Sequence, residues 1–187
     1  MLRRAFIYLL LTALPVLAQD LEGNDTPGNW RVKHFQTFGI WNSMCDEREE
    51  NGTLNQRCYI RYVDVFSPRP EFAAQFLFIV AEEGRENVEF GLEPGTLFSP
   101  NGFRIDTGDT VRWRTRRPGC LTGLSCTFRD DGAAELLGAM TEGDAMRFVF
   151  IDRHGNARDI TWPLDGFADA LADFRSQSRA RALLPAS

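Results

Sequence analysis

The chain has 187 residues, with 21 Lys and Arg against 26 Asp and Glu, which gives a formal net charge of −5. This length fits one domain, and the 43% hydrophobic and 12% aromatic residues exclude wholesale disorder because they suffice for a core. The acidic balance excludes a general nucleic-acid binder, which would carry a basic surface.

The N-terminal residues 1–18 have the pattern of a secretory signal peptide. Arg3 and Arg4 precede an apolar run over residues 5–14, and Ala18 ends a small-residue cleavage site. The run is too short for the alternative, an uncleaved membrane anchor, which needs roughly 20 apolar residues. We therefore expect cleavage after Ala18, no stable membrane span after cleavage, and a periplasmic, secreted or cell-surface location. Loss of the two arginines changes the net charge from −5 to −7.

The polar residues 19–29 indicate a flexible leader. We expect one domain over residues 30–179 and a frayed tail over residues 180–187. Within the domain most segments alternate apolar and polar residues with a period of two, which indicates β-strands. Residues 30–45 are expected to form a strand pair or a bent strand, and residues 56–66 a single strand.

Residues 72–81 are the most apolar stretch of the domain. Both faces of this segment are apolar apart from Gln75, so we expect a central strand covered on both sides. Shorter strands are expected to follow at residues 88–92, 103–105, 111–116 and 124–128, with a hairpin formed by residues 145–151 and 157–164.

Two helices are expected among these strands. Residues 133–140 form a short one, and residues 166–179 carry an apolar stripe typical of a surface helix, with Asp165 as its N-cap. About nine short strands in one run predict an antiparallel β-sandwich or a partly open barrel. We expect the C-terminal helix to cover an open end or an edge of this mainly β fold.

Four cysteines remain in the exported chain, at Cys45, Cys58, Cys120 and Cys126. Oxidising conditions and an even number favour disulfides, for which four cysteines allow three connectivities. We favour the local pairs Cys45–Cys58 and Cys120–Cys126, because each closes a short loop rich in turn-forming residues. A zinc site or a redox-active dithiol would use C-x2-C spacing, which the sequence lacks.

The clearest charged feature is a stripe of arginines in the predicted strand 111–116, formed by Arg112, Arg114 and Arg116, with Arg117 adjacent. A period of two places the first three on one strand face, roughly 7 Å apart. Such a face can bind phosphate or carboxylate groups of lipopolysaccharide, of another anionic glycan or of an acidic partner. The alternative is a solvated face, or pairing with acids on neighbouring strands.

No catalytic or metal-binding set emerges from the sequence. His34 and His154 lie far apart, and neither comes with metal-ligand spacing or a G-x-S-x-G nucleophile motif. Four acids also lack the spacing of a calcium loop, so we expect them in a solvated acidic loop: Asp46, Glu47, Glu49 and Glu50.

Several short motifs occur in a defined order: Phe38-Gly39-Ile40-Trp41 before Cys45, Gln56-Arg57-Cys58-Tyr59-Ile60, Gly119-Cys120 before Cys126, and Trp162-Pro163-Leu164-Asp165-Gly166-Phe167. With the signal peptide, they resemble the invasion-associated locus B (IalB) family of bacterial exported proteins, over about residues 35–174. The resemblance implies a periplasmic or surface protein with a disulfide-tied β-sandwich, and it supplies no catalytic residues. Some members of that family are linked to host-cell entry.

We expect a non-enzymatic exported β-domain that binds an envelope component or a partner protein and uses no cofactor, metal ion or nucleic acid. One alternative is an enzyme acting on glycans through scattered carboxylates, which would show two facing carboxylates, one with a raised pKa. The other is an envelope-integrity or chaperone-like factor, which would show an open sheet edge or an exposed aromatic groove.

Overall fold

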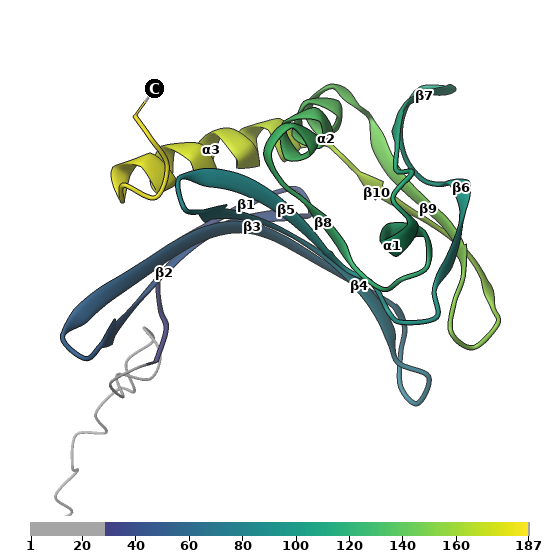
Figure 1. Cartoon of the computed structure of the whole chain (residues 1–187), viewed down its shortest axis with the longest axis horizontal. Helices are drawn as coiled ribbons and strands as arrows, with labels where there is room; N and C mark the ends of the chain where they lie inside the picture. Colours follow the sequence, from purple (N-terminus) through teal and green to yellow (C-terminus); the bar gives the residue numbers. More distant parts are fainter. Residues whose placement is uncertain (1–28, 187) are drawn as a thin grey trace, which may run out of the picture.

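The structure is a computed structural model, and it describes residues 29–186. The predicted signal peptide and the leader up to residue 28 lie outside the described residues. The strands are β1 (Arg31–Phe38), β2 (Trp41–Glu50), β3 (Thr53–Ser67), β4 (Ala73–Glu82), β5 (Arg85–Gly91), β6 (Leu97–Thr107), β7 (Thr110–Arg114), β8 (Cys126–Phe128), β9 (Ala145–Ile151) and β10 (Ala157–Pro163). The helices are α1 (Pro118–Leu121), α2 (Asp130–Glu142) and α3 (Phe167–Ala180) (Figure 1).

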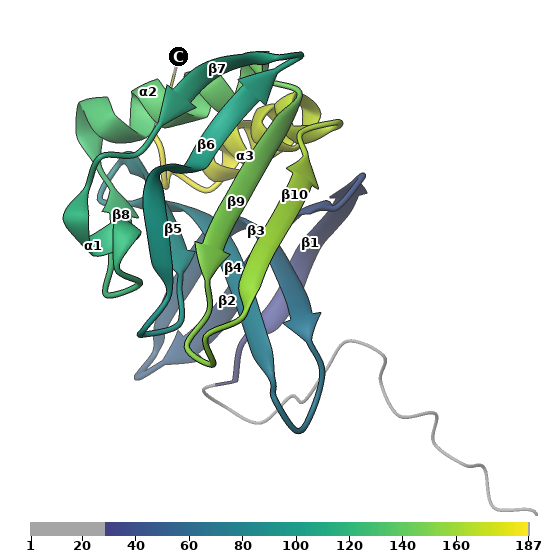
Figure 2. The same ribbon diagram turned by 90° about the vertical axis from the view of Figure 1, so that its right-hand side faces the viewer.

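The strands form two antiparallel sheets. The larger sheet has the order β1-β2-β3-β4-β5-β8, and the smaller has the order β10-β9-β6-β7. Figure 2 shows the smaller sheet lying across one part of the larger one. The prediction of a mainly β antiparallel sandwich with a short helix and a C-terminal helix is therefore confirmed, and the sheets do not close into a barrel.

All the helices lie on the same side of the larger sheet as the smaller sheet does (Figure 1). We call this side of the larger sheet its inner face and the opposite side its outer face. Helix α3 packs against β1, β2 and β3, where the smaller sheet leaves the inner face uncovered. The expectation that the C-terminal helix would cover an end or an edge is wrong, because its apolar stripe is used to complete the core.

The start of α3 also differs from the prediction. Gly166 is the N-cap with φ +79°, and Asp165 makes no capping hydrogen bond. A Cβ at Gly166 would lie 3.0 Å from the carbonyl of Phe38, so both the positive φ and the close approach favour glycine here. Beyond the helix, Leu184 is only 8% exposed and joins the core, in contrast to the frayed tail that the sequence predicted.

The aromatic centre of the core joins the two sheets. Trp162 on β10 is 1% exposed, and its ring centre lies 4.4 Å from that of Phe148 and 5.0 Å from that of Tyr62. Its indole Nε1 donates a hydrogen bond of 2.8 Å to Asp64 Oδ2 on β3. A side chain of the smaller sheet thus contacts the larger sheet through both packing and a polar bond.

Strand β4 lies in the middle of the larger sheet, but only one of its faces is covered. Its inner side chains include Leu77 and Ile79, both fully buried, whereas Phe76 on the outer face is 40% exposed. The expected cover on both faces is wrong because the helices and the smaller sheet all pack on the inner face. Gln75, the one polar residue of the stretch, points inward and is 1% exposed.

The turn between β9 and β10 is organised by the buried side chain of Asp152. Its Oδ1 accepts hydrogen bonds of 2.9 Å from the backbone N–H groups of His154 and Asn156, and its Oδ2 accepts one of 2.8 Å from Arg158 Nε. Burial alone would raise the pKa of Asp152, but these hydrogen bonds outweigh it and lower the pKa to about 2.

Replacement of Asp152 by asparagine is expected to destabilise the protein in a pH-dependent manner. Because the pKa of Asp152 is about 2 in the folded protein against an ordinary value of 3.8, the ionised carboxylate favours folding above about pH 4. That contribution falls as the pH drops from about 4 to about 2. Urea unfolding of both proteins should therefore show a stability difference that is constant from pH 7 to 5 and shrinks below pH 4.

The matched control is Asp109→Asn, in the exposed turn between β6 and β7, where the carboxylate has no partner within residues 29–186. This variant should follow the wild-type protein at every pH. A stability difference for Asp152→Asn that stayed unchanged down to pH 2 would contradict the assigned role of the carboxylate.

Candidate functional site

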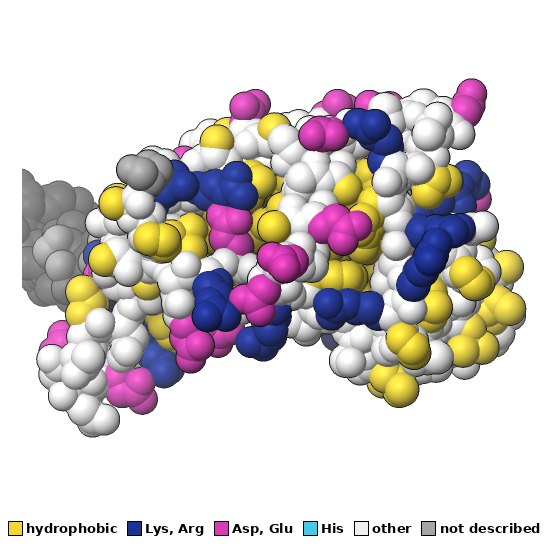
Figure 3. Space-filling view, turned by 45° about the horizontal axis from the view of Figure 1, so that its top comes forward, with side chains coloured by type: hydrophobic (Ala, Val, Ile, Leu, Met, Phe, Trp, Pro, Cys, Tyr) yellow, Lys and Arg dark blue, Asp and Glu magenta, His cyan; other side chains and the backbone are white. Residues whose placement is uncertain are grey.

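A cavity of about 590 Å³ lies beside β7, at the edge of the smaller sheet. It is lined by the consecutive residues Val111 to Arg117, together with Phe128 from β8 and Gly132 and Glu135 from α2. Among the described strands, β7 pairs only with β6. The cavity therefore lies along an open strand edge, whose backbone groups have no neighbouring strand to pair with. Figure 3 views one face of the whole molecule, on which basic, acidic and apolar side chains are mixed.

The arginine stripe forms one wall of this cavity. Arg112, Arg114 and Arg116 are exposed, while the intervening Trp113 and Thr115 are 9% and 2% exposed. Strand β7 ends at Arg114, but the alternation continues because the backbone N–H of Thr115 still bonds to the carbonyl of Phe103 at 3.1 Å. The structure thus places the three arginines on one side, as their spacing predicts.

The three arginines differ in their partners. Arg112 forms an ion pair of 3.0 Å with Glu142, and Arg114 donates a hydrogen bond of 2.6 Å to Asn101 Oδ1. Arg116 has neither an ion pair nor a hydrogen bond to any residue between 29 and 186. The side chains of Arg112 and Glu142 are 47% and 68% exposed, and an ion pair so exposed contributes little stability. These arginines can therefore exchange their contacts for those of a ligand at low cost.

Arg117 has a different role from the stripe. Its guanidinium lies 4.4 Å from the ring centre of Phe128 and donates a hydrogen bond to the backbone carbonyl of Thr127. Phe128 in turn packs edge-on against Trp113, with ring centres 5.6 Å apart. Arg117 is thus held against an aromatic wall, and the cavity combines cationic and aromatic surfaces.

Three residues of the cavity were missed by reasoning from the sequence: Phe128, Gly132 and Glu135. Phe128 comes from β8, and Gly132 and Glu135 come from α2, so only the tertiary fold brings them next to β7. Glu135 is the single carboxylate among the residues that line the cavity. The cavity consequently lacks the facing pair of carboxylates that most glycoside hydrolases use.

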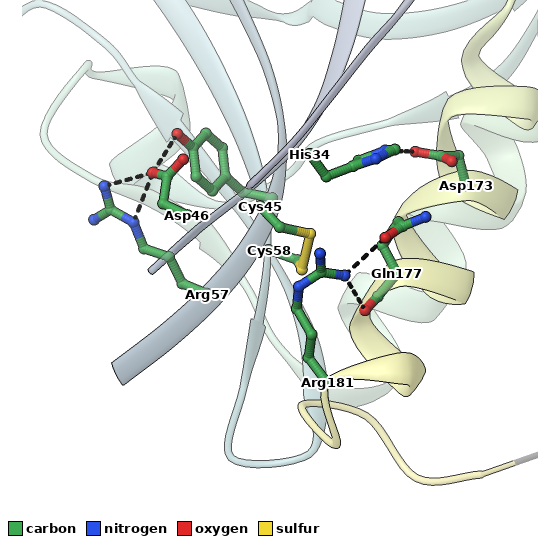
Figure 4. Close-up of a disulfide and its surroundings, with 9 residues drawn as sticks. His34, Cys45, Asp46, Arg57, Cys58, Asp173, Gln177 and Arg181 are labelled. Carbon is green, nitrogen blue, oxygen red and sulfur yellow. Dashed lines mark hydrogen bonds and ion pairs between the residues drawn. A yellow bond between two sulfur atoms is a disulfide. The ribbon is translucent and has the colours of Figure 1, made fainter. Parts of the chain in front are cut away.

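The other candidate residues are placed elsewhere. His34 Nε2 lies 2.7 Å from Asp173 Oδ2, which joins β1 to α3 (Figure 4). His154 is exposed in the β9–β10 turn. Among the described residues, no cluster of three or more His, Cys, Asp or Glu side chains is arranged to hold a metal ion.

The acids near Cys45 do not form the solvated loop that the sequence predicted, because they lie on β2. Asp46 is only 4% exposed and accepts hydrogen bonds from Arg57 Nη2 at 3.0 Å and from the hydroxyl of Tyr59 at 2.9 Å. That hydroxyl is partly buried and bonded to a carboxylate, and both effects raise the pKa of Tyr59.

The structure joins the four cysteines as Cys45–Cys58 and Cys120–Cys126, with S–S distances of 2.05 and 2.10 Å. Cys45 and Cys58 are directly opposite each other on β2 and β3, close to α3 (Figure 4). The second disulfide links α1 to β8, and these two elements follow the cavity-lining residues 111–117 in the chain. No helix within residues 29–186 is long and apolar enough to cross a membrane.

The fold and these disulfides define a two-sheet β-sandwich with one covered and one bare face on its larger sheet. A family model described as "Invasion associated locus B (IalB) protein" matches residues 41–175, and the chain belongs to this family. The crystal structure of invasion associated protein B from Bartonella henselae is similar, with 18% sequence identity and a TM-score of 0.48. The match covers 78% of this chain and 99% of that one. A search of curated proteins gave no significant match.

Proposed function

We propose that this IalB-family protein is a non-enzymatic binding protein of the bacterial envelope, and that the arginine-lined cavity beside β7 is its ligand site. The observation that carries the proposal is the convergence of four arginines on one cavity, with Arg116 lacking any partner within the described chain. The ligand chemistry that fits is a phosphate or carboxylate group, which guanidinium groups bind through paired hydrogen bonds.

The charge distribution of the whole molecule supports selective binding of an anionic ligand at this cavity. The chain as a whole is acidic, with a net charge of −5, so a local basic cavity directs anions to one place. The aromatic rings of Trp113 and Phe128 give the same cavity an apolar wall. An anionic headgroup attached to an apolar or planar body would contact both surfaces.

The proposal includes export with cleavage after Ala18 and residence in the periplasm or on the cell surface. Two disulfides support an oxidising compartment. The binding test therefore uses protein isolated from the envelope fraction, and its intact mass reports whether the mature chain begins at Gln19.

The variant Arg112→Ala/Arg114→Ala/Arg116→Ala is expected to bind an anionic ligand at least about tenfold more weakly than the wild type, because charge-assisted hydrogen bonds contribute about 1.5–3 kcal/mol each. Trp113 lies in the cavity, so tryptophan fluorescence reports binding. One titration uses lipopolysaccharide vesicles and a second uses a soluble acidic peptide, which separates an envelope lipid from a protein partner.

The matched control is Arg69→Ala/Arg147→Ala/Arg179→Ala, which removes the same charge outside the residues that line the cavity. This control should bind like the wild type. Equal affinity of the cavity variant and the wild type for both ligands would refute the proposed site, and equal weakening by both triple variants would show a bulk charge effect only.

A further inference from the structure

The outer face of the larger sheet carries an apolar surface that none of the described residues covers. Its side chains come from four neighbouring strands and include Phe35, Tyr59, Val63, Val65, Phe76, Phe78 and Val80, with Met44 on β2 only 6% exposed between them. Four of them are 40–53% exposed: Phe35, Val63, Val65 and Phe76. A contiguous apolar surface of this kind marks an interaction site more often than an ordinary solvated face.

One exposed ring of this surface lies close against the sheet. The ring of Phe76 lies over Gly91 on β5, where a Cβ atom would come within 1.9 Å of the ring. The glycine thus lets the ring lie down on the sheet instead of standing out from it. Two sheets pack face to face at about 10 Å with their strands nearly aligned, as in β-sandwiches.

One row of this face carries two charges of opposite sign. One row across β3, β4 and β5 reads Arg61, Phe78 and Glu89. The side chains of Arg61 and Glu89 have no ion pair or hydrogen bond within residues 29–186. The buried acid of the face, Asp46, is already paired with Arg57. One unpaired cation and one unpaired anion therefore flank a central aromatic ring.

We propose that the outer face binds the outer face of a second copy of this chain. A two-fold axis that runs parallel to β4, in front of Phe78 and between the two copies, exchanges the β3 side for the β5 side of the row. Arg61 of each copy then faces Glu89 of the other, and the two Phe78 rings meet at the axis. Such an isologous contact satisfies both charges with one surface, which is the usual form of a homodimer interface.

This arrangement favours a second copy over other occupants. An anionic or cationic partner would satisfy only one of the two charges and leave the other desolvated, which is unfavourable. In a dimer of two copies, both charges of each copy have a partner, and the apolar outer face of each copy is covered by that of the other. The proposed ligand cavity lies at the edge of the smaller sheet, outside this face. The dimer and the anion site can therefore be tested independently of each other.

The test is sedimentation equilibrium of the mature protein across the micromolar range, and the wild type is expected to sediment as a dimer. Arg61→Glu places two acids opposite each other, and Glu89→Arg places two bases opposite each other. Each single variant should therefore dimerise at least about tenfold more weakly than the wild type, because like charges directly opposite repel.

Mixing the two single variants is the decisive measurement. An equimolar mixture should form a heterodimer, and the double variant Arg61→Glu/Glu89→Arg should dimerise again, neither of which a misfolded variant could do. Arg179→Glu, an exposed charge reversal on α3, should remain dimeric like the wild type. A monomeric wild type, single variants as dimeric as the wild type, or a mixture that stays monomeric would each overturn the proposed interface.

Discussion

Replacement of Trp162 by alanine is expected to lower the free energy of unfolding by about 3–5 kcal/mol. The ring is 1% exposed and packs against Phe148 and Tyr62, so its removal leaves a cavity between the two sheets. The variant also removes the hydrogen bond from Nε1 to Asp64, which leaves a part-buried carboxylate without that donor. Urea unfolding monitored by far-UV circular dichroism measures the change.

Two further variants separate these contributions. Trp162→Phe keeps an aromatic ring but loses the N–H group, and it should cost less than the alanine variant. Trp30→Ala removes a tryptophan that is only partly buried and lies under Arg57 on the surface, so its effect should be the smallest. Equal losses for the alanine variants at positions 162 and 30 would contradict the central position of Trp162.

Removal of the first disulfide by Cys45→Ala/Cys58→Ala is expected to cost about 3 kcal/mol, because the bond closes a loop that the unfolded chain would otherwise leave free. The shorter loop of Cys120→Ala/Cys126→Ala should cost somewhat over 2 kcal/mol on the same grounds. The sequence separations of 13 and 6 residues set this order. Chemical denaturation of both double variants, without reductant, measures the two losses.

The comparison contains its own control, because all four cysteines are buried and each variant removes two sulfur atoms. Packing losses are therefore similar, and the difference between the variants reports the loop length. A larger loss for the shorter loop would show that local packing around α1 and β8, rather than loop closure, determines the contribution of the disulfides.

Much of the β structure could be predicted from alternating residues. The hairpin of β9 and β10, the alternation along β7, and helix α3 all follow from local patterns that one covered face imposes. The pattern fails for β4, whose outward residues Phe76 and Phe78 are as apolar as its inward ones. Its outer side is apolar although Phe76 is 40% exposed there, and no rule of local periodicity distinguishes an exposed apolar face from one buried in a core.

The candidate site was only partly predictable for a related reason. The spacing of Arg112, Arg114 and Arg116 is local, so their shared side could be derived from the strand period. The cavity itself also needs Phe128 and Glu135, whose positions depend on how β8 and α2 return to the edge of β7. Likewise, Asp46 is buried opposite Arg57 on the neighbouring strand of the hairpin. The cluster of acids after Cys45 in the sequence indicated the charge of Asp46 but not this pairing.

The position of α3 has a consequence for the order in which the molecule can assemble. The last helix of the chain covers the inner face of its first three strands, so residues such as Phe167 and Phe174 contact segments made long before them. Until the C-terminus is available, the apolar inner face of β1, β2 and β3 stays open to solvent and to mispairing. Contacts so distant in sequence slow folding. A chain that emerges N-terminus first must therefore be complete before its first hairpin is protected.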